Sequence, residues 1–260
     1  MRTLFYLFLV SLLFGGCQKV LDLNLNSKDP LIVIEGEISD DTLIPQTVKI
    51  TKSVNFTENN SFPTVSGALV TVNDNLGNTV TLNEVSPGVY QNTTLHGYSG
   101  RTYYLSVIAE GKTYSSVCTM PSKVPLDTIL IGNSSGLSSS KAAIPVFHDP
   151  AGRGNYYRFK LYDDSKVSTS ILLIDDQIID GFINNRPLSA PDITIRTNDT
   201  IQIKMMCVDK AVYQYLKDLN NNGGGPNGSA TPANPTSNIN GATLGYFSAQ
   251  TVQIKKVIAQ

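Results

Sequence analysis

One string in the chain has the spacing of a catalytic serine. Residues 132–136 read Gly-Asn-Ser-Ser-Gly and match the G-x-S-x-G pattern of a nucleophile elbow. That motif acts on a strand-to-helix turn, where a histidine and an acid reach the serine. Here it lies in a Ser/Gly-rich stretch, and His96 and His148 are the only histidines among 260 residues. The pattern therefore favours a plain loop over a serine hydrolase acting through Ser134.

Metal chemistry has few candidate ligands in this sequence. There is no H-E-x-x-H string, and two histidines with three cysteines are too few for a zinc site. Carboxylates at Asp163-Asp164 and Asp175-Asp176, with Asp149 and Asp180, offer the oxygen ligands that calcium prefers. Because neighbouring side chains on a strand point to opposite faces, we predict turn and solvent-facing roles for them instead. No metal is expected.

Aromatic side chains are the remaining candidates for binding. The chain has no tryptophan and 12 tyrosines, and the second half contains Tyr156, Tyr157, Tyr162, Tyr213, Tyr215 and Tyr246. Alternation along a strand separates Tyr156 from Tyr157, so one of the two is predicted to face outward. Packing is the default role of these rings. Tyr156 and Tyr157 are the candidate ligand- or partner-binding residues.

The first half of the chain has the pattern of short β-strands. Residues 69–72 and 79–82 flank a turn rich in Asn, Asp and Gly, which is typical of a hairpin. Residues 102–109 and 112–117 form a second such pair, joined by two residues that include a glycine. With no helical period between the strands, residues 31–122 are predicted to form an Ig-like β-sandwich.

A proline-rich break at residues 121–125 separates the second half. We place the domain boundary there and predict a second β-rich domain over 123–260. The fold is thus expected to be mainly all-β, with two β-sandwich domains in tandem and one short helix. Asp209 as N-cap and an apolar stripe predict that helix over 209–220. The Gly/Pro/Asn-rich run 223–238 has little to bury and is predicted to be a mobile loop.

Residues 1–16 have the pattern of a signal peptide. Arg2 precedes an apolar run that is too short to span a bilayer, and Gly15-Gly16 ends it. Cys17 follows, as in the bacterial lipobox, so we predict a lipoprotein signal, lipidation of Cys17 with palmitate among its acyl chains, and a lipid-anchored tether over 17–30. An ordinary signal peptide followed by a chance cysteine is the alternative.

Composition indicates which classes of partner to expect and whether the protein lies in an oxidising compartment. A formal net charge of −1 with 16% charged residues argues against a nucleic-acid binder and against a disordered chain. No cofactor is expected apart from the covalent lipid. Cys118 and Cys207 could pair in an oxidising compartment, but two separate buried thiols are the favoured interpretation.

Both ends of the chain resemble a known family. Residues 17–25 with 30–40, and residues 234–249, are similar to Bacteroidota outer-membrane lipoproteins catalogued as domain of unknown function 4249. The resemblance implies a lipoprotein often encoded beside TonB-dependent outer-membrane receptors, with no family catalytic residue to carry over. The middle of the chain also resembles the carboxypeptidase regulatory-like or transthyretin-like module, a non-catalytic accessory domain.

Three Asp-Thr-apolar strings resemble the sites at which Bacteroidota glycosylate exported proteins. They place candidate glycosylation at Thr42, Thr128 and Thr200, although the third string could be a turn leading into a strand.

Together these features predict a non-enzymatic outer-membrane lipoprotein in the cell envelope. Its predicted role is that of an accessory subunit of a TonB-dependent transporter for nutrient uptake, with the β-barrel receptor as partner and no nucleic acid. A free-standing surface lipoprotein that binds glycan or peptide is the alternative, and a hydrolase is the third. Gln18-Lys19 after the lipid cysteine resembles surface-export signals, which favours the surface over the periplasmic face.

Overall fold

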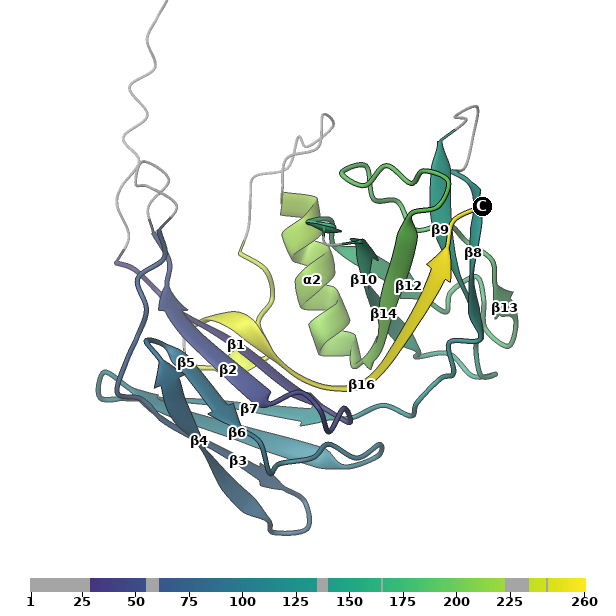
Figure 1. Cartoon of the computed structure of the whole chain (residues 1–260). Coiled ribbons are helices and arrows are strands. Elements are labelled where there is room, and N and C mark those ends of the chain that lie inside the picture. The colour runs from purple at the N-terminus through teal and green to yellow at the C-terminus, as the bar shows by residue number, and fades with distance from the viewer. Residues whose placement is uncertain (1–28, 55–60, 135–139, 165, 223–233, 242) are drawn as a thin grey trace, which may run out of the picture.

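The computed structural model describes residues 29–54, 61–134, 140–164, 166–222, 234–241 and 243–260 (Figure 1). The strands are β1 (Ile32–Ser39), β2 (Gln46–Lys52), β3 (Leu69–Asp74), β4 (Thr79–Ser86), β5 (Val89–Asn92), β6 (Thr102–Ala109), β7 (Lys112–Thr119), β8 (Thr128–Asn133), β9 (Lys141–His148), β10 (Tyr156–Asp163), β11 (Lys166–Val167), β12 (Leu172–Asp175), β13 (Ile183–Asn184), β14 (Thr200–Val208), β15 (Ile239–Asn240) and β16 (Leu244–Ile258). Helix α2 (Lys210–Asn222) is the helix of the described residues. The predicted mainly β, sandwich-like fold is confirmed.

Both predicted hairpins form. β3 pairs antiparallel with β4, and β6 pairs antiparallel with β7. The two residues that join β6 to β7, Glu110 and Gly111, have φ of 50° and 74°. Positive φ at both positions gives a turn whose twist matches that of the strands. Alternate residues of β3 and β6 then enter the first apolar core, and the residues between them face solvent.

The first sandwich is completed by the end of the chain. Its strands follow the order β16-β1-β2-β5-β4-β3-β6-β7-β15. β16 lies parallel to β1, from Val33 opposite Leu244 to Ser39 opposite Gln250, and Phe247 lies in the first core. Ile239, Phe247 and Ala249, which the sequence pattern assigns to the second domain, therefore lie in the first core. Parallel pairing joins segments far apart in sequence, so local patterning does not reveal it.

The second sandwich uses the rest of the same strand. Beyond residue 250, β16 pairs antiparallel with β14, which pairs with β10, and β10 pairs with β11 and β12. A three-stranded sheet in the order β13-β9-β8 packs on it around a second core that includes Phe147, Phe159 and Ile203. Figure 1 shows β16 running from beside β1 to beside β14, so one continuous strand joins the two sandwiches.

Helix α2 forms where the sequence predicts it. The Val212 N–H donates to Oδ1 of Asp209 at 2.8 Å, so Asp209 is the N-cap. The apolar side of α2, with Val212 and Leu216, packs on Met206 and Val252 of the β14–β16 sheet in a third apolar core. Figure 1 places the helix on the side of that sheet that faces the first sandwich.

The two internal cysteines lie apart. Cys118 is buried in the first core and Cys207 in the second, and both are free thiols, which confirms the favoured interpretation. Cys17, the signal peptide 1–16 and most of the run 223–238 lie outside the described residues, so those predictions stay predictions. No described helix combines the length and apolar character needed to cross a membrane.

Candidate functional site

Ser134 follows strand β8, and no hydrogen bond joins it to a described histidine. The Ser134 N–H donates to the carbonyl of Ser140 at 2.8 Å, and the two hydroxyl oxygens lie 2.8 Å apart. His148 ends β9, eight residues beyond Ser140, which is about 26 Å along an extended strand. His96 belongs to the first half of the chain, between β5 and β6. The described residues therefore lend no support to the hydrolase candidate.

The predicted turn roles of the carboxylates hold in one loop. Asp176 accepts the N–H groups of Gly154 and Asn155 at 2.5 and 2.8 Å, and Asp180 accepts that of Gly152 at 2.6 Å. These bonds hold the loop that enters β10. Asp176 is nevertheless 3% exposed, so the predicted solvent-facing role is wrong for it. Residues 154–155, which are distant in sequence, pack against this turn and bury it.

A second carboxylate group lies at the opposite end of β10. Oxygen atoms of Asp163, Asp164 and Asp199 lie within 4.8 Å of one another. Asp199 accepts the N–H of Arg196 at 2.6 Å, and Asp164 accepts that of Thr200 at 3.4 Å, so these two serve turns. Burial, followed by the two neighbouring carboxylates, raises the pKa of Asp163. Three partly exposed acids of this kind define no metal site by themselves.

Of the two candidate binding tyrosines, one is buried and the other half-buried. Tyr157 is 1% exposed and donates its hydroxyl to Oδ1 of Asp149, which is 0% exposed. Tyr156 lies on the opposite face, as alternation predicts, and is half-buried, because the Tyr213 ring of α2 packs against it with a centroid distance of 4.9 Å. The face of Tyr156 is therefore as predicted, but the ring is not open to solvent. Only the position of α2 over the sheet determines this, so the local sequence could not show it.

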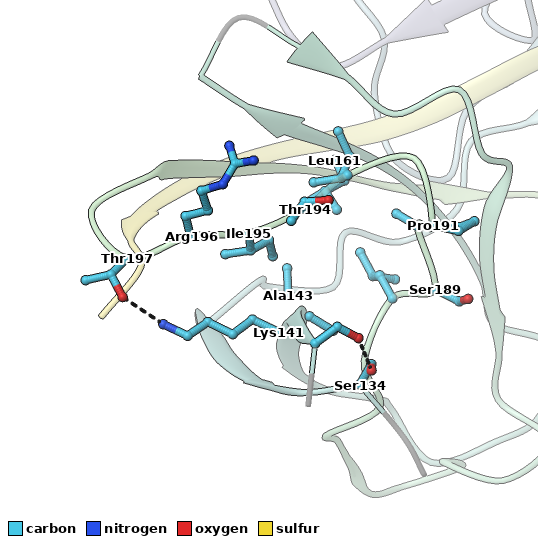
Figure 2. A pocket seen from close by; sticks show the side chains of 15 residues that line it. Ser134, Lys141, Ala143, Leu161, Ser189, Pro191, Thr194, Ile195, Arg196 and Thr197 are labelled. Atoms are coloured by element: carbon cyan, nitrogen blue, oxygen red, sulfur yellow. Dashed lines mark hydrogen bonds between the residues drawn. The ribbon is translucent and has the colours of Figure 1, made fainter. Parts of the chain in front are cut away.

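A ligand-sized cavity lies elsewhere in the second sandwich. It encloses about 660 Å³ between the start of β9 and the irregular segment 188–197 (Figure 2). Its lining combines an apolar floor, several hydroxyls and two cations: Ser134, Ser140, Lys141, Ala142, Ala143, Leu161, Leu188, Ser189, Ala190, Pro191, Ile193, Thr194, Ile195, Arg196 and Thr197. Sequence analysis missed this site. The local signal was the apolar alternation of Ile193 and Ile195 directly after Pro191.

The polar groups of the cavity are hydroxyls and two cations. Its lining contains no histidine, cysteine or carboxylate, so Lys141 and Arg196 are its charged groups. Lys141 donates to Oγ1 of Thr197 at 3.1 Å and to the main-chain oxygen of Gln260. In Figure 2 the Arg196 guanidinium points away from Lys141. The polar groups could orient a hydroxyl- or carboxylate-bearing ligand above an apolar floor.

A half-buried ionic network lies where the two sandwiches meet. Oε1 of Glu37 on β1 accepts from Arg158 of β10 at 2.8 Å and from the Tyr246 hydroxyl of β16 at 2.8 Å. Gln250 donates to Oε2 of Glu37 at 3.3 Å. Burial acts to raise the pKa of Glu37, but the charges of Arg158 and Lys160 outweigh it and lower that pKa. The network ties three distant strands together, so sequence spacing did not reveal it.

The candidate glycosylation residues differ in exposure. Thr42, in the turn between β1 and β2, and Thr128, at the start of β8, are exposed. Thr200 begins β14 and is half-buried, and its N–H donates to Asp164. The third string therefore has the turn-to-strand role that its sequence also allowed.

These observations define a mainly β protein of two joined sandwiches, with a ligand-sized cavity in the second. The chain belongs to the family described as Domain of unknown function (DUF4249), whose model matches residues 18–256. No curated protein matches it.

Two solved structures are similar in part. A segment of two fibronectin type-III domains from chicken tenascin is 11% identical, with 88% of this chain and 100% of that chain covered and a TM-score of 0.24. The FN1–FN3 domains of chicken CNTN1 are 11% identical, with 87% and 66% covered and a TM-score of 0.26. At these TM-scores we draw no conclusion from either likeness.

Proposed function

We propose that this protein is a non-enzymatic outer-membrane lipoprotein of Bacteroidota that acts as an accessory subunit of a TonB-dependent transporter for nutrient uptake. The lipobox-like sequence at Cys17 and the family resemblance support the anchor. A lipid on Cys17 confines the protein to the membrane beside its partner, which raises the effective concentration without strong contacts.

An exposed apolar surface on the first sandwich supports a protein, and not a small molecule, as the binding partner. Leu69 lies directly opposite Ile108, and Tyr104 directly opposite Val117, on neighbouring strands of one sheet. Their side chains are 50%, 44%, 42% and 53% exposed. We call these four residues the outer-face row. Exposed apolar groups gathered on one face mark sites of protein contact, whereas the candidate tyrosines offer no open aromatic cleft.

The test is co-purification from gently solubilised outer membranes. The full chain carries a C-terminal tag, and the variant is Ile108→Ser with Val117→Ser. Val85→Ser is the control, because Val85 is 59% exposed on β4 and is not in the outer-face row. We expect a TonB-dependent β-barrel in stoichiometric amount with the wild type and the control, and at least a tenfold loss with the double variant. Recovery of the wild type alone would refute the proposal.

The anchor is tested separately in the same preparations. Cys17→Ser should abolish incorporation of labelled palmitate and move the protein out of the membrane fraction. Retention of label by this variant would contradict lipidation at Cys17.

The cavity of Figure 2 favours a second candidate function, a surface lipoprotein that binds glycan or peptide. This candidate now rests on the cavity and not on Tyr156 or Tyr157. Titration of oligosaccharides and short peptides against the full chain separates the two candidates. Saturable binding that Thr194→Trp abolishes by filling the cavity, with no β-barrel in the purification, would favour the second.

A further inference from the structure

Two lysines face each other directly in the second sandwich. Lys160 on β10 lies opposite Lys204 on β14 in the antiparallel register. Directly opposed side chains have Cβ atoms about 5 Å apart, and like charges in that position destabilise a sheet. Such a pair therefore calls for a compensating negative group.

Both lysines lie on one identifiable face of the sheet. Their strand neighbours Leu161 and Ile203 are buried in the second core, so Lys160 and Lys204 point to the other side. Helix α2 covers that side only over the rows nearer the end of β14, around Met206 and Val208. Lys160 and Lys204 are half-buried beyond it.

No described group neutralises the pair by direct contact. Neither ammonium group makes a hydrogen bond or a salt bridge with the residues that the structure describes. Two carboxylates act on Lys204 through space, Glu37 and Asp41, and the oxygens of Glu37 are occupied by Arg158, Tyr246 and Gln250. Arg158 itself lies two residues from Lys160 on the same face, which adds a further positive charge.

The surroundings make the unpaired charge costly. Burial lowers the pKa of Lys204 below its ordinary value, the charge of Glu37 opposes that shift, and the charge of Lys160 adds to it. The carboxylate of Asp41 acts in the same direction as Glu37, but neither acid contacts the ammonium group directly, so a cation that has lost part of its water gains from an anionic ligand placed against it. Lysine binds phosphate and carboxylate groups as a point charge.

The next row of the same face adds uncharged donors. Tyr162 lies directly opposite Gln202, two residues along from the lysine pair on each strand. Lys256 of β16 lies opposite Gln202 and is exposed. The row thus places a phenol, an amide and a third ammonium group beside the two lysines.

We propose that Lys160 and Lys204, with Tyr162 and Gln202 beside them, form a binding site for an oxyanion group, either a phosphate or a carboxylate of a small ligand. The site is distinct from the outer-face row and from the cavity of Figure 2. The inference does not depend on the accessory role proposed above.

The test compares inorganic phosphate and acetate with sodium chloride at equal ionic strength, by calorimetric titration and thermal unfolding of the full chain. Wild-type protein should bind phosphate or acetate saturably. Lys160→Met and Lys204→Met should each weaken that binding at least tenfold. Lys49→Met is the control, an exposed lysine on β2 that lies opposite Glu35, and it should bind within twofold of the wild type.

A second measurement separates a ligand site from a structural role. In chloride alone, Lys204→Met should raise Tm by about 2 °C, because it removes a half-buried unpaired charge. Saturating anion should raise the Tm of the wild type and leave that of the variant unchanged. Absence of saturable binding by both anions, equal binding by all variants, or a lower Tm for Lys204→Met in chloride would each overturn the proposal. Preference for phosphate or for acetate identifies which oxyanion the site takes.

Discussion

Each sandwich buries an aspartate, and the two carboxylates differ in how completely they are hydrogen-bonded. Asp74 of the first sandwich accepts a salt bridge from Arg101 at 2.9 Å and hydrogen bonds from Asn78 and Leu76. Oδ1 of Asp149 in the second sandwich accepts from the Tyr157 hydroxyl. Burial raises the pKa of this carboxyl group, although the backbone N–H of Gly181 also acts to lower it. Oδ2 has no partner among the described residues. Asp74 is therefore fully paired by its own turn and by Arg101. Asp149 keeps an incompletely satisfied charge.

The same contrast runs through the larger architecture. The first sandwich is a regular core with an outer surface available to a partner, the outer-face row. The second carries the cavity, the candidate tyrosines and the opposed lysines. Groups that can bind a small molecule thus gather in the second sandwich, while the first offers a surface. β16 belongs to both, so the two are expected to unfold together.

The largest expected effect tests that shared strand. Gly245 has φ +99°, and a Cβ added there would lie 1.9 Å from the carbonyl oxygen of Ile34. Gly245→Ala should lower the free energy of unfolding by at least about 3 kcal/mol, because backbone must move at the start of β16. Denaturant unfolding measures it, and hydrogen exchange in β6 and β14 shows whether both sandwiches lose protection.

Gly77→Ala provides the matched control. Gly77 also has positive φ, +87°, but nothing lies within 4 Å of an added Cβ. This change should cost about 1–2 kcal/mol, which is the conformational penalty alone. Equal losses for the two variants would contradict the clash at Ile34, and loss of protection in β6 alone would show that the sandwiches unfold separately.

The next effect tests the junction. Arg158→Met leaves Glu37 half-buried without its main cation and should cost about 2 kcal/mol. Adding Glu37→Gln should recover part of that loss, since the amide oxygen still accepts from Tyr246 and carries no charge. A double-mutant cycle by urea unfolding measures the coupling. Additive losses would show that the ion pair does not link the sandwiches energetically.

The smallest effects should have opposite signs in the two sandwiches. Asp74→Asn removes charged hydrogen bonds and should cost about 1–2 kcal/mol at pH 7. Asp149→Asn removes an incompletely paired buried charge and should stabilise by about 1 kcal/mol at pH 7. Urea unfolding of both variants tests the signs, and a loss of stability in Asp149→Asn would contradict the contrast.

The pH dependence follows from the same two groups. Burial raises the pKa of Asp149, so its unfavourable contribution is fully present above the folded pKa and disappears as pH falls from the folded pKa to the unfolded one. Burial acts to raise the pKa of Asp74, but the hydrogen bonds from Asn78 and Leu76 and the charge of Arg101 outweigh burial and lower that pKa. Its contribution is present above the unfolded pKa and is lost as pH falls through the folded one. Asp149→Asn should therefore be less favourable relative to wild type at pH 4.5 than at pH 7.

Local signals were enough to predict the local elements. Alternation and turn residues placed the hairpins β3–β4 and β6–β7, and Asp209 followed by an apolar stripe placed α2, because each signal and its structure lie within a few residues. The break at residues 121–125 likewise falls between β7 and β8.

Only the tertiary structure determined which of these elements meet. β16 closes the first sandwich against β1 although more than 200 residues separate them, and the register of β10 on β14 sets Lys160 against Lys204. The position of α2 half-buries Tyr156, which alternation alone left exposed. Pairing between distant strands depends on the packing of the whole chain. The alternation within one strand predicts which side chains share a face, but not which element packs against that face.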